Sequence, residues 1–194
     1  MTPDEFLSLW HDASPTMEVC TSGSTGTPKH IYIEKERMRA SARMTCDFLG
    51  LKHGDTALLC MSLDFIAGKM MMVRAIERTM QLLHVEPSGH PLSTQNMESI
   101  GTPSGIDFAA MVPLQVWNTL QVPEERERVL GIRHLIIGGG AISRPLEDAL
   151  RSLPVNVWSS YGMTETLSHI ALRRISEDHY APLPGSSLEQ DEEG

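Results

Sequence analysis

Short apolar runs alternate with longer segments of helical character along most of this 194-residue chain. The apolar runs have the length and the flanking polar residues that are typical of buried strands. Several of the longer segments end at glycine or begin at proline, as helices often do. This alternation predicts an α/β fold in which a mixed, mostly parallel sheet carries helices on its faces.

The predicted elements follow one another closely. Strands are expected at residues 30–35, 56–61, 81–86, 107–113, 133–140, 155–162 and 168–176. Helices are expected at residues 34–49 and 65–80, and two more begin near Pro113 and Pro145. We expect Gly50 to stop the first helix and Ser143 to cap the last. Residues 87–106 are rich in serine, threonine, proline and glycine, which predicts a loop with a short helix.

Charge and cysteine usage exclude several classes of protein. The formal net charge is −9, so neither nucleic acid nor an anionic membrane is an expected partner. No apolar run approaches the roughly 20 residues of a membrane helix, and the acidic residues 1–12 do not resemble a signal peptide. Cys20, Cys46 and Cys60 form no CxxC pair and no metal-binding pattern. We expect them to be buried free thiols of a cytoplasmic protein.

Residues 21–29, with the sequence TSGSTGTPK, gather hydroxyl side chains, two glycines and one lysine. Glycine allows a backbone to approach a ligand closely, and successive backbone N–H groups can surround an anion. The hydroxyl groups and Lys29 add donors and a positive charge, so the segment suits a polyphosphate. The spacing differs from that of a Walker A loop, which needs a hydroxyl residue after its lysine. The alternative is a flexible polar linker.

Two further motifs follow in the chain, IIGGGAIS at residues 136–143 and YGMTET at residues 161–166. Together with residues 21–29 they resemble the motifs of the adenylate-forming superfamily, in that family's order. This superfamily includes acyl- and aryl-CoA ligases, adenylation domains and luciferases. The resemblance spans most of the chain and implies the large N-terminal domain of such an enzyme.

The resemblance implies a role for each motif. Lys29, Thr164 and Glu165 would be catalytic, and Glu165 would also hold Mg²⁺, which binds through few carboxylates plus phosphate oxygens. Tyr161 would stack on adenine, and the three glycines of the second motif would let a flat ring or an acyl chain lie against their backbone. The implied nucleotide-binding residues are Thr21, Ser22, Gly23, Ser24, Thr25, Gly26, Thr27, Lys29, Gly138, Gly139, Gly140, Ser160, Tyr161, Gly162 and Thr164.

A narrower resemblance is to the o-succinylbenzoate–CoA ligases of menaquinone biosynthesis. Residues 61–77 are similar to the segment in which those enzymes carry a glycine followed, six residues later, by an arginine, here Gly68 and Arg74. Arg74 would clamp the second carboxylate of the acid, because a guanidinium binds a carboxylate through two parallel hydrogen bonds. The implied substrate-binding residues are Phe65, Arg74, Gly139 and Met163.

Alternatives remain open for this segment. Relatives often have a histidine where this chain has Phe65, which makes the predicted gate apolar. Helical periodicity places Arg74 away from the apolar stripe of its helix, either in solvent or at the rim of a pocket. The alternative to a clamp is therefore a surface arginine on an amphipathic helix.

The implied activity is activation of a carboxylic acid by ATP to acyl-AMP, followed by transfer of the acyl group to coenzyme A. The expected acid is o-succinylbenzoate, and another aryl or acyl acid is the alternative. We expect residues 1–194 to be part of an AMP-binding domain, because the family's ribose-binding aspartate and its small C-terminal domain with a catalytic lysine do not appear before Gly194. A nucleotide-binding module without turnover and a non-enzymatic scaffold are the other two hypotheses. The sequence predicts no oligomeric state.

Overall fold

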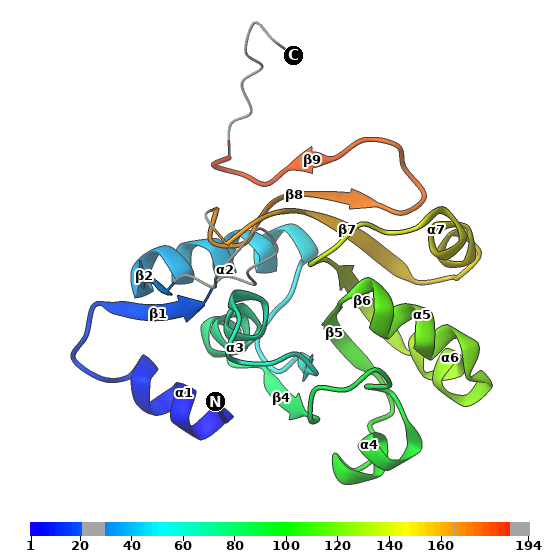
Figure 1. Cartoon of the computed structure of the whole chain (residues 1–194), viewed down its shortest axis with the longest axis horizontal. Helices are drawn as coiled ribbons and strands as arrows, with labels where there is room; N and C mark the ends of the chain where they lie inside the picture. The colour runs from blue at the N-terminus through cyan, green and yellow to red at the C-terminus, as the bar shows by residue number, and fades with distance from the viewer. Residues whose placement is uncertain (21–29, 165, 187–194) are drawn as a thin grey trace, which may run out of the picture.

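The computed structural model describes residues 1–20, 30–164 and 166–186. Its strands are β1 Thr16–Cys20, β2 His30–Glu34, β3 Thr56–Leu59, β4 Gln81–His84, β5 Ile106–Met111, β6 Ile132–Ile137, β7 Asn156–Gly162, β8 His169–Arg174 and β9 Ala181–Pro182. Its helices are α1 Pro3–Trp10, α2 Lys35–Leu49, α3 Ile66–Arg78, α4 Thr94–Ser99, α5 Pro113–Gln121, α6 Pro123–Leu130 and α7 Arg144–Arg151. Figure 1 shows how these elements are arranged.

The main sheet has seven strands in the order β4-β3-β5-β6-β7-β8-β9. The strands β4, β3, β5, β6 and β7 are parallel, whereas β8 and β9 add to the edge in antiparallel orientation. A separate antiparallel hairpin is formed by β1 and β2. The predicted α/β class with a mixed, mostly parallel sheet is therefore confirmed.

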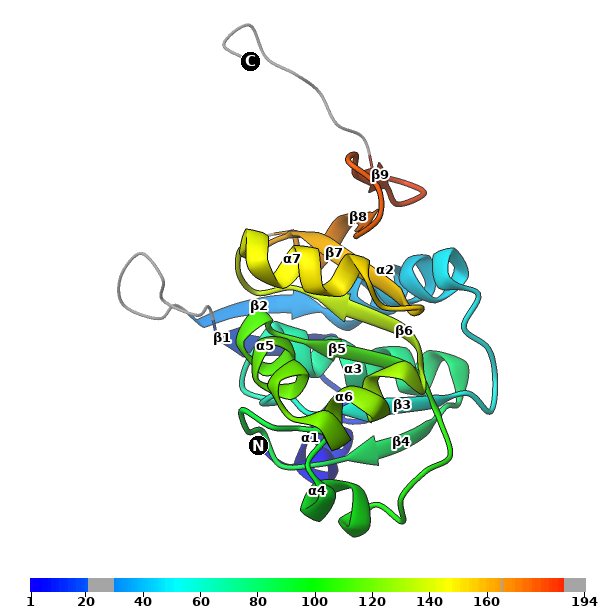
Figure 2. The same cartoon turned by 90° about the vertical axis from the view of Figure 1, so that its right-hand side faces the viewer.

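Helices cover both faces of the sheet (Figures 1 and 2). Side chains of α1, α2 and α3 share one core with Leu59, Phe108 and Ile136 of the sheet. Side chains of α4, α5, α6 and α7 share the other core with Leu58 and Leu135. Successive strand residues thus point to opposite faces, and both faces are apolar because both are buried.

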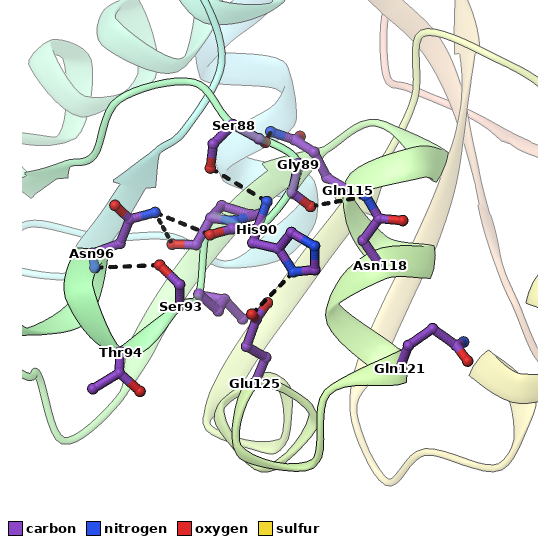
Figure 3. A network of polar contacts seen from close by, with 12 residues as sticks. Ser88, Gly89, His90, Ser93, Thr94, Asn96, Gln115, Asn118, Gln121 and Glu125 are labelled. Carbon is purple, nitrogen blue, oxygen red and sulfur yellow. Dashed lines mark hydrogen bonds and ion pairs between the residues drawn. The ribbon is translucent and has the colours of Figure 1, made fainter.

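A polar network joins the segment after β4 to helices α5 and α6 (Figure 3). The Gln115 side-chain amide donates to the carbonyl oxygens of Cys60 at 3.0 Å and Ser88 at 2.9 Å. Nearby, Nδ1 of His90 lies 3.0 Å from a carboxylate oxygen of the buried Glu125. These contacts fix the loop at residues 87–93, inside the region that the sequence predicts as loop with a short helix.

Helix ends agree with the prediction in part. Gly50 ends α2 in the left-handed conformation, with φ of 66°, as expected. The residue that ends α3 is Thr79, with φ of 48°, so that helix stops short of residue 80. Ser143 occupies the N-cap position of α7 but its side chain makes no capping hydrogen bond, so that prediction is wrong in its detail.

Four short elements were not expected from the sequence: α1, β1, α6 and β9. In α1, Thr2 and Glu5 form a capping box, and Phe6 and Trp10 are buried in the core. The helix has only eight residues, so its stability comes from this packing and hardly from helix propensity.

The cysteines are free thiols, and Cys46 and Cys60 are buried as predicted. Burial raises the pKa of the Cys60 thiol to about 12. Cys20 is only half-buried, because it lies at the end of β1 beside residues 21–29, so the expectation of burial is wrong for this cysteine. Within the described ranges, no helix combines the length and the apolar character needed to cross a membrane.

Candidate active site

The carboxyl ends of the parallel strands meet at one edge of the sheet, where ligands bind in many open α/β sheets. The segment 138–140 follows β6, and the neighbouring strand β7 ends with Ser160, Tyr161 and Gly162. The structure therefore brings two of the predicted motifs together, although 20 residues separate Gly140 from Ser160 in the chain.

Close packing explains one glycine at this edge, and backbone conformation explains the next. A Cβ atom on Gly138 would lie 2.3 Å from the Ser160 hydroxyl oxygen, which itself donates to the Ile137 carbonyl at 3.2 Å. Gly139 has φ of 76°, a conformation that favours glycine. The backbone here stays bare of side chains, so a flat group can lie against it.

Tyr161 presents an exposed aromatic ring beside this backbone, with 53% of the residue accessible. Its ring centroid lies 5.9 Å from that of Tyr180, whose hydroxyl is 2.7 Å from the Ser159 hydroxyl. Sequence reasoning missed Tyr180, which sits just before β9 and lies outside every motif. The exposed ring of Tyr161 can stack on a planar base.

The residues that follow β7 form a turn held by its own side chains. The Thr166 hydroxyl accepts from the Met163 amide at 2.9 Å, and the Leu167 amide donates to the Thr164 carbonyl at 2.9 Å. Leu167 has φ of 72° although it is not glycine, and its side chain is buried. Met163 is exposed and Thr164 half-buried at the open edge of the sheet.

Two predicted parts of the site lie outside the described residues. These are the segment 21–29, which includes Lys29, and Glu165, the predicted metal ligand. Among the residues that are described, no group of three or more histidine, cysteine, aspartate or glutamate side chains is placed to hold a metal ion.

The described residues nevertheless fix both ends of the segment 21–29. Cys20 and His30 are paired across the β1–β2 hairpin, and Cys20 also forms an isolated parallel bridge with Phe65. Phe65 is 45% exposed and precedes α3. Cys20, which directly precedes the segment 21–29, therefore lies beside the predicted apolar gate.

Close packing explains why residue 68 is a glycine, a reason that the sequence analysis did not give. A Cβ atom there would lie 2.3 Å from the Ser62 carbonyl oxygen and 2.7 Å from its carbon. Because both atoms belong to the backbone, a larger residue would push α3 away from the loop that leads into it.

The burial of Arg74 contradicts the alternative of a surface arginine in solvent, whereas its position at a substrate pocket stays a prediction. The residue is 3% exposed and lies beneath the start of β8. Its Nη2 group donates to the Ser168 hydroxyl at 2.9 Å, whereas Nε is buried and has no hydrogen-bond partner in the part of the chain that the structure describes. Burial lowers the pKa of the Arg74 guanidinium to about 10, against a smaller opposing effect of Cys46. No carboxylate of the described part of the chain forms an ion pair with it.

His169 lies beside this arginine and also escaped the sequence analysis. Its Nε2 atom is 2.9 Å from the Thr45 hydroxyl, which donates to the Ser41 carbonyl at 3.2 Å. Burial, and then the positive charge of Arg74, hold the pKa of His169 well below its usual value. The imidazole is therefore neutral at pH 7.

Comparison with known proteins accounts for the arrangement of these motifs. A crystal structure of an acyl-CoA synthetase (AMP-forming)/AMP-acid ligase II-like protein from Dyadobacter fermentans is 34% identical, with a TM-score of 0.87, over 98% of this chain and 54% of that one. The o-succinylbenzoate coenzyme A synthetase (MenE) of Bacillus subtilis, in complex with ATP and magnesium ion, is 26% identical, with a TM-score of 0.67, over 82% of this chain and 32% of that one.

Curated relatives include a 2-succinylbenzoate–CoA ligase from Bacillus cereus. It is 27% identical over 169 residues, which are 87% of this chain and 34% of that protein, so the chain spans about a third of its length. The family model described as AMP-binding enzyme matches residues 11–190. The chain belongs to the AMP-binding enzyme family.

Proposed function

We propose that the protein acts as an acid–CoA ligase that activates a carboxylic acid with ATP. In the first step a carboxylate oxygen attacks the α-phosphorus, the bond to the β-phosphate breaks, and acyl-AMP and pyrophosphate result. In the second step the coenzyme A thiolate attacks the acyl carbon and AMP leaves, which gives a thioester. Family membership supports this reaction class, and the relatives named 2-succinylbenzoate–CoA ligase support 2-succinylbenzoate as the acid. The role that we propose is in menaquinone biosynthesis, in the cytoplasm.

The nucleotide would bind along the carboxyl edge of the sheet. Tyr161 would stack on adenine beside the bare backbone at residues 138–140, and Thr164 would donate to the α-phosphate. The segment 21–29, with Lys29, would hold the other phosphates, so catalysis would consist mainly of positioning and charge stabilisation.

Glu165 would hold Mg²⁺ together with phosphate oxygens of the nucleotide. Magnesium bound in this way needs few protein carboxylates. Bound Mg²⁺ would neutralise phosphate charge.

A single observation carries the choice of acid: Arg74 is a buried cation with no carboxylate partner in the described structure. Burying an unpaired charge costs several kcal/mol, roughly, so a fold seldom retains one without a use. A second carboxylate on the substrate would supply the missing charge. Because Arg74 is 3% exposed, neighbouring side chains would have to move to admit it. The acid we propose is 2-succinylbenzoate, which carries two carboxylates.

Two measurements test this proposal in order. Calorimetric titration with Mg·ATP should show binding, and its absence would leave a non-enzymatic scaffold. ATP–pyrophosphate exchange should then depend on added acid and be fastest with 2-succinylbenzoate. Nucleotide binding without acid-dependent exchange would favour the second candidate, a nucleotide-binding module without turnover.

A further inference from the structure

We propose that Ser168, His169 and Thr45 are positioning residues that orient the Arg74 guanidinium for a carboxylate. The inference rests on the proposed function, because it names what prepares the acid site. None of the three is among the site residues that the sequence analysis named, and they come from two distant parts of the chain, α2 and the start of β8.

The hydrogen bonds among these residues have one consistent direction. A guanidinium has donors and no acceptor, so the Ser168 oxygen accepts from Arg74 Nη2 at 2.9 Å. The Ser168 hydroxyl can then donate to Nδ1 of His169, 3.4 Å away. Nε2 of His169 carries the proton and donates to Thr45, whose hydroxyl donates to the Ser41 carbonyl. Each donor hydrogen in this series of hydrogen bonds is used once, and the series ends at a backbone carbonyl of α2.

The positive charge of Arg74 explains the donor-to-acceptor direction of these hydrogen bonds. A protonated His169 would place a second positive charge beside the guanidinium and would lose Nδ1 as an acceptor. The partly buried position of His169 disfavours that form as well. The site therefore keeps one positive charge, on Arg74.

The backbone holds Ser168 and His169 in place. The preceding residue, Leu167, is in a left-handed conformation that costs roughly 1–2 kcal/mol for a residue other than glycine. On the other side, a Cβ atom on Gly162 would lie 2.4 Å from the Ser168 carbonyl oxygen. Strain of this kind persists only where the surroundings fix the conformation, and it is common at ligand sites.

This series of hydrogen bonds uses only some of the N–H donors of the Arg74 guanidinium. Ser168 accepts one hydrogen bond, from Nη2, while the buried Nε–H group has no acceptor among the described residues. A carboxylate can accept two parallel N–H bonds, one of them from Nε. A neutral substituent at this place would leave the charge uncompensated, so the arrangement favours an acid with a second anionic group.

The test uses Ser168→Ala, Ser168→Thr and Thr45→Val, with Thr119→Val as the matched control. Thr119 is also a fully buried threonine, but its hydroxyl has no partner and lies on the opposite face of the sheet. ATP–pyrophosphate exchange gives KM and kcat for 2-succinylbenzoate and for two monoacids, benzoate and 4-oxo-4-phenylbutanoate, that each keep one of its carboxylates.

Loss of the Ser168 hydroxyl should raise KM for 2-succinylbenzoate about 3- to 10-fold, the effect of one hydrogen bond. The kcat, the KM for ATP and the KM for both monoacids should stay within about twofold. Ser168→Thr should restore most of the loss, Thr45→Val should have a smaller effect of the same kind, and Thr119→Val should have none.

Two results would overturn the inference while leaving the proposed function intact. One is an unchanged preference for the diacid in Ser168→Ala and Thr45→Val, and the other is an equal loss for diacid, monoacid and ATP. If the unaltered protein shows no acid-dependent exchange, the proposed function fails and this inference fails with it. If Ser168→Ala does not fold, Thr45→Val decides between these outcomes.

Discussion

The two faces of the sheet each bury a charged side chain, and they treat it differently. On the α3 side, Arg74 is 3% exposed and contacts one hydroxyl group. On the α6 side, Glu125 is 5% exposed, and one of its carboxylate oxygens lies 3.0 Å from the His90 ring within a polar network (Figure 3). The two side chains are buried to a similar extent, but only Glu125 has an ionisable partner among the described residues.

This difference distinguishes buried polar groups that stabilise the fold from a buried polar group that we propose binds a ligand. The network around Glu125 ties the loop after β4 to α5 and α6, so its groups serve the fold. Among the described residues, Arg74 makes one side-chain hydrogen bond, to Ser168. We propose that Arg74, a buried cation with no carboxylate partner among the described residues, binds a substrate group of opposite charge.

The largest expected effect is that of Arg74→Met, which removes the charge and keeps an apolar chain of similar length. KM for 2-succinylbenzoate should rise about 10- to 150-fold, the value of a charged hydrogen bond. The fold should become more stable by roughly 1–3 kcal/mol, because an unpaired buried charge is lost. Exchange kinetics and urea unfolding measure the two changes.

Arg74→Lys is a control that keeps the positive charge at this position but removes the planar guanidinium. It should recover only part of the diacid affinity, because an ammonium cannot match both carboxylate oxygens. The KM for ATP should barely change in either variant. A destabilised Arg74→Met protein that loses diacid, monoacid and ATP alike would show that Arg74 serves the fold.

A smaller effect concerns pH. Since His169 is neutral in the folded protein and protonates near pH 6.5 when unfolded, stability is present above pH 6.5 and falls as the pH is lowered. The loss between pH 6.5 and 5.5 should be about 1 kcal/mol.

His169→Gln should remove that part of the pH dependence in urea unfolding. The pKa of His134 is also lowered, chiefly by burial, and its contribution is common to both proteins, so the difference between them isolates His169. Identical slopes for the two proteins would mean that His169 takes up its proton at the same pH in the folded and unfolded states, contrary to the directed hydrogen-bond chain.

The sequence predicts the sheet well because buried parallel strands form continuous apolar runs bounded by glycine and proline. It also predicts that the segment 138–140 and Tyr161 belong to one site, since motif order carries that information. It does not predict Arg74's surroundings. Helical periodicity describes one helix, whereas the burial of Arg74 depends on Ser168, which is 94 residues away. A buried polar residue therefore breaks the pattern on which the sequence argument relies.

The smallest expected effect is that of Glu125→Gln. The change keeps the shape and removes the attraction to His90, whose side chain is 47% exposed, so stability should change by less than about 1 kcal/mol. Acid selectivity in the exchange assay should not change. A shift in diacid preference comparable to that of Arg74→Met would remove the distinction between the two faces.

The most direct test changes the ligand and leaves the protein unaltered. Calorimetry would compare the affinity for 2-succinylbenzoate with that for 4-oxo-4-phenylbutanoate, which lacks the carboxylate on the ring. If Arg74 binds the second carboxylate of the substrate, 2-succinylbenzoate should bind about 10- to 150-fold more tightly than 4-oxo-4-phenylbutanoate. Equal affinities for the two compounds would contradict the claim that the unpaired charge of Arg74 is kept for the substrate.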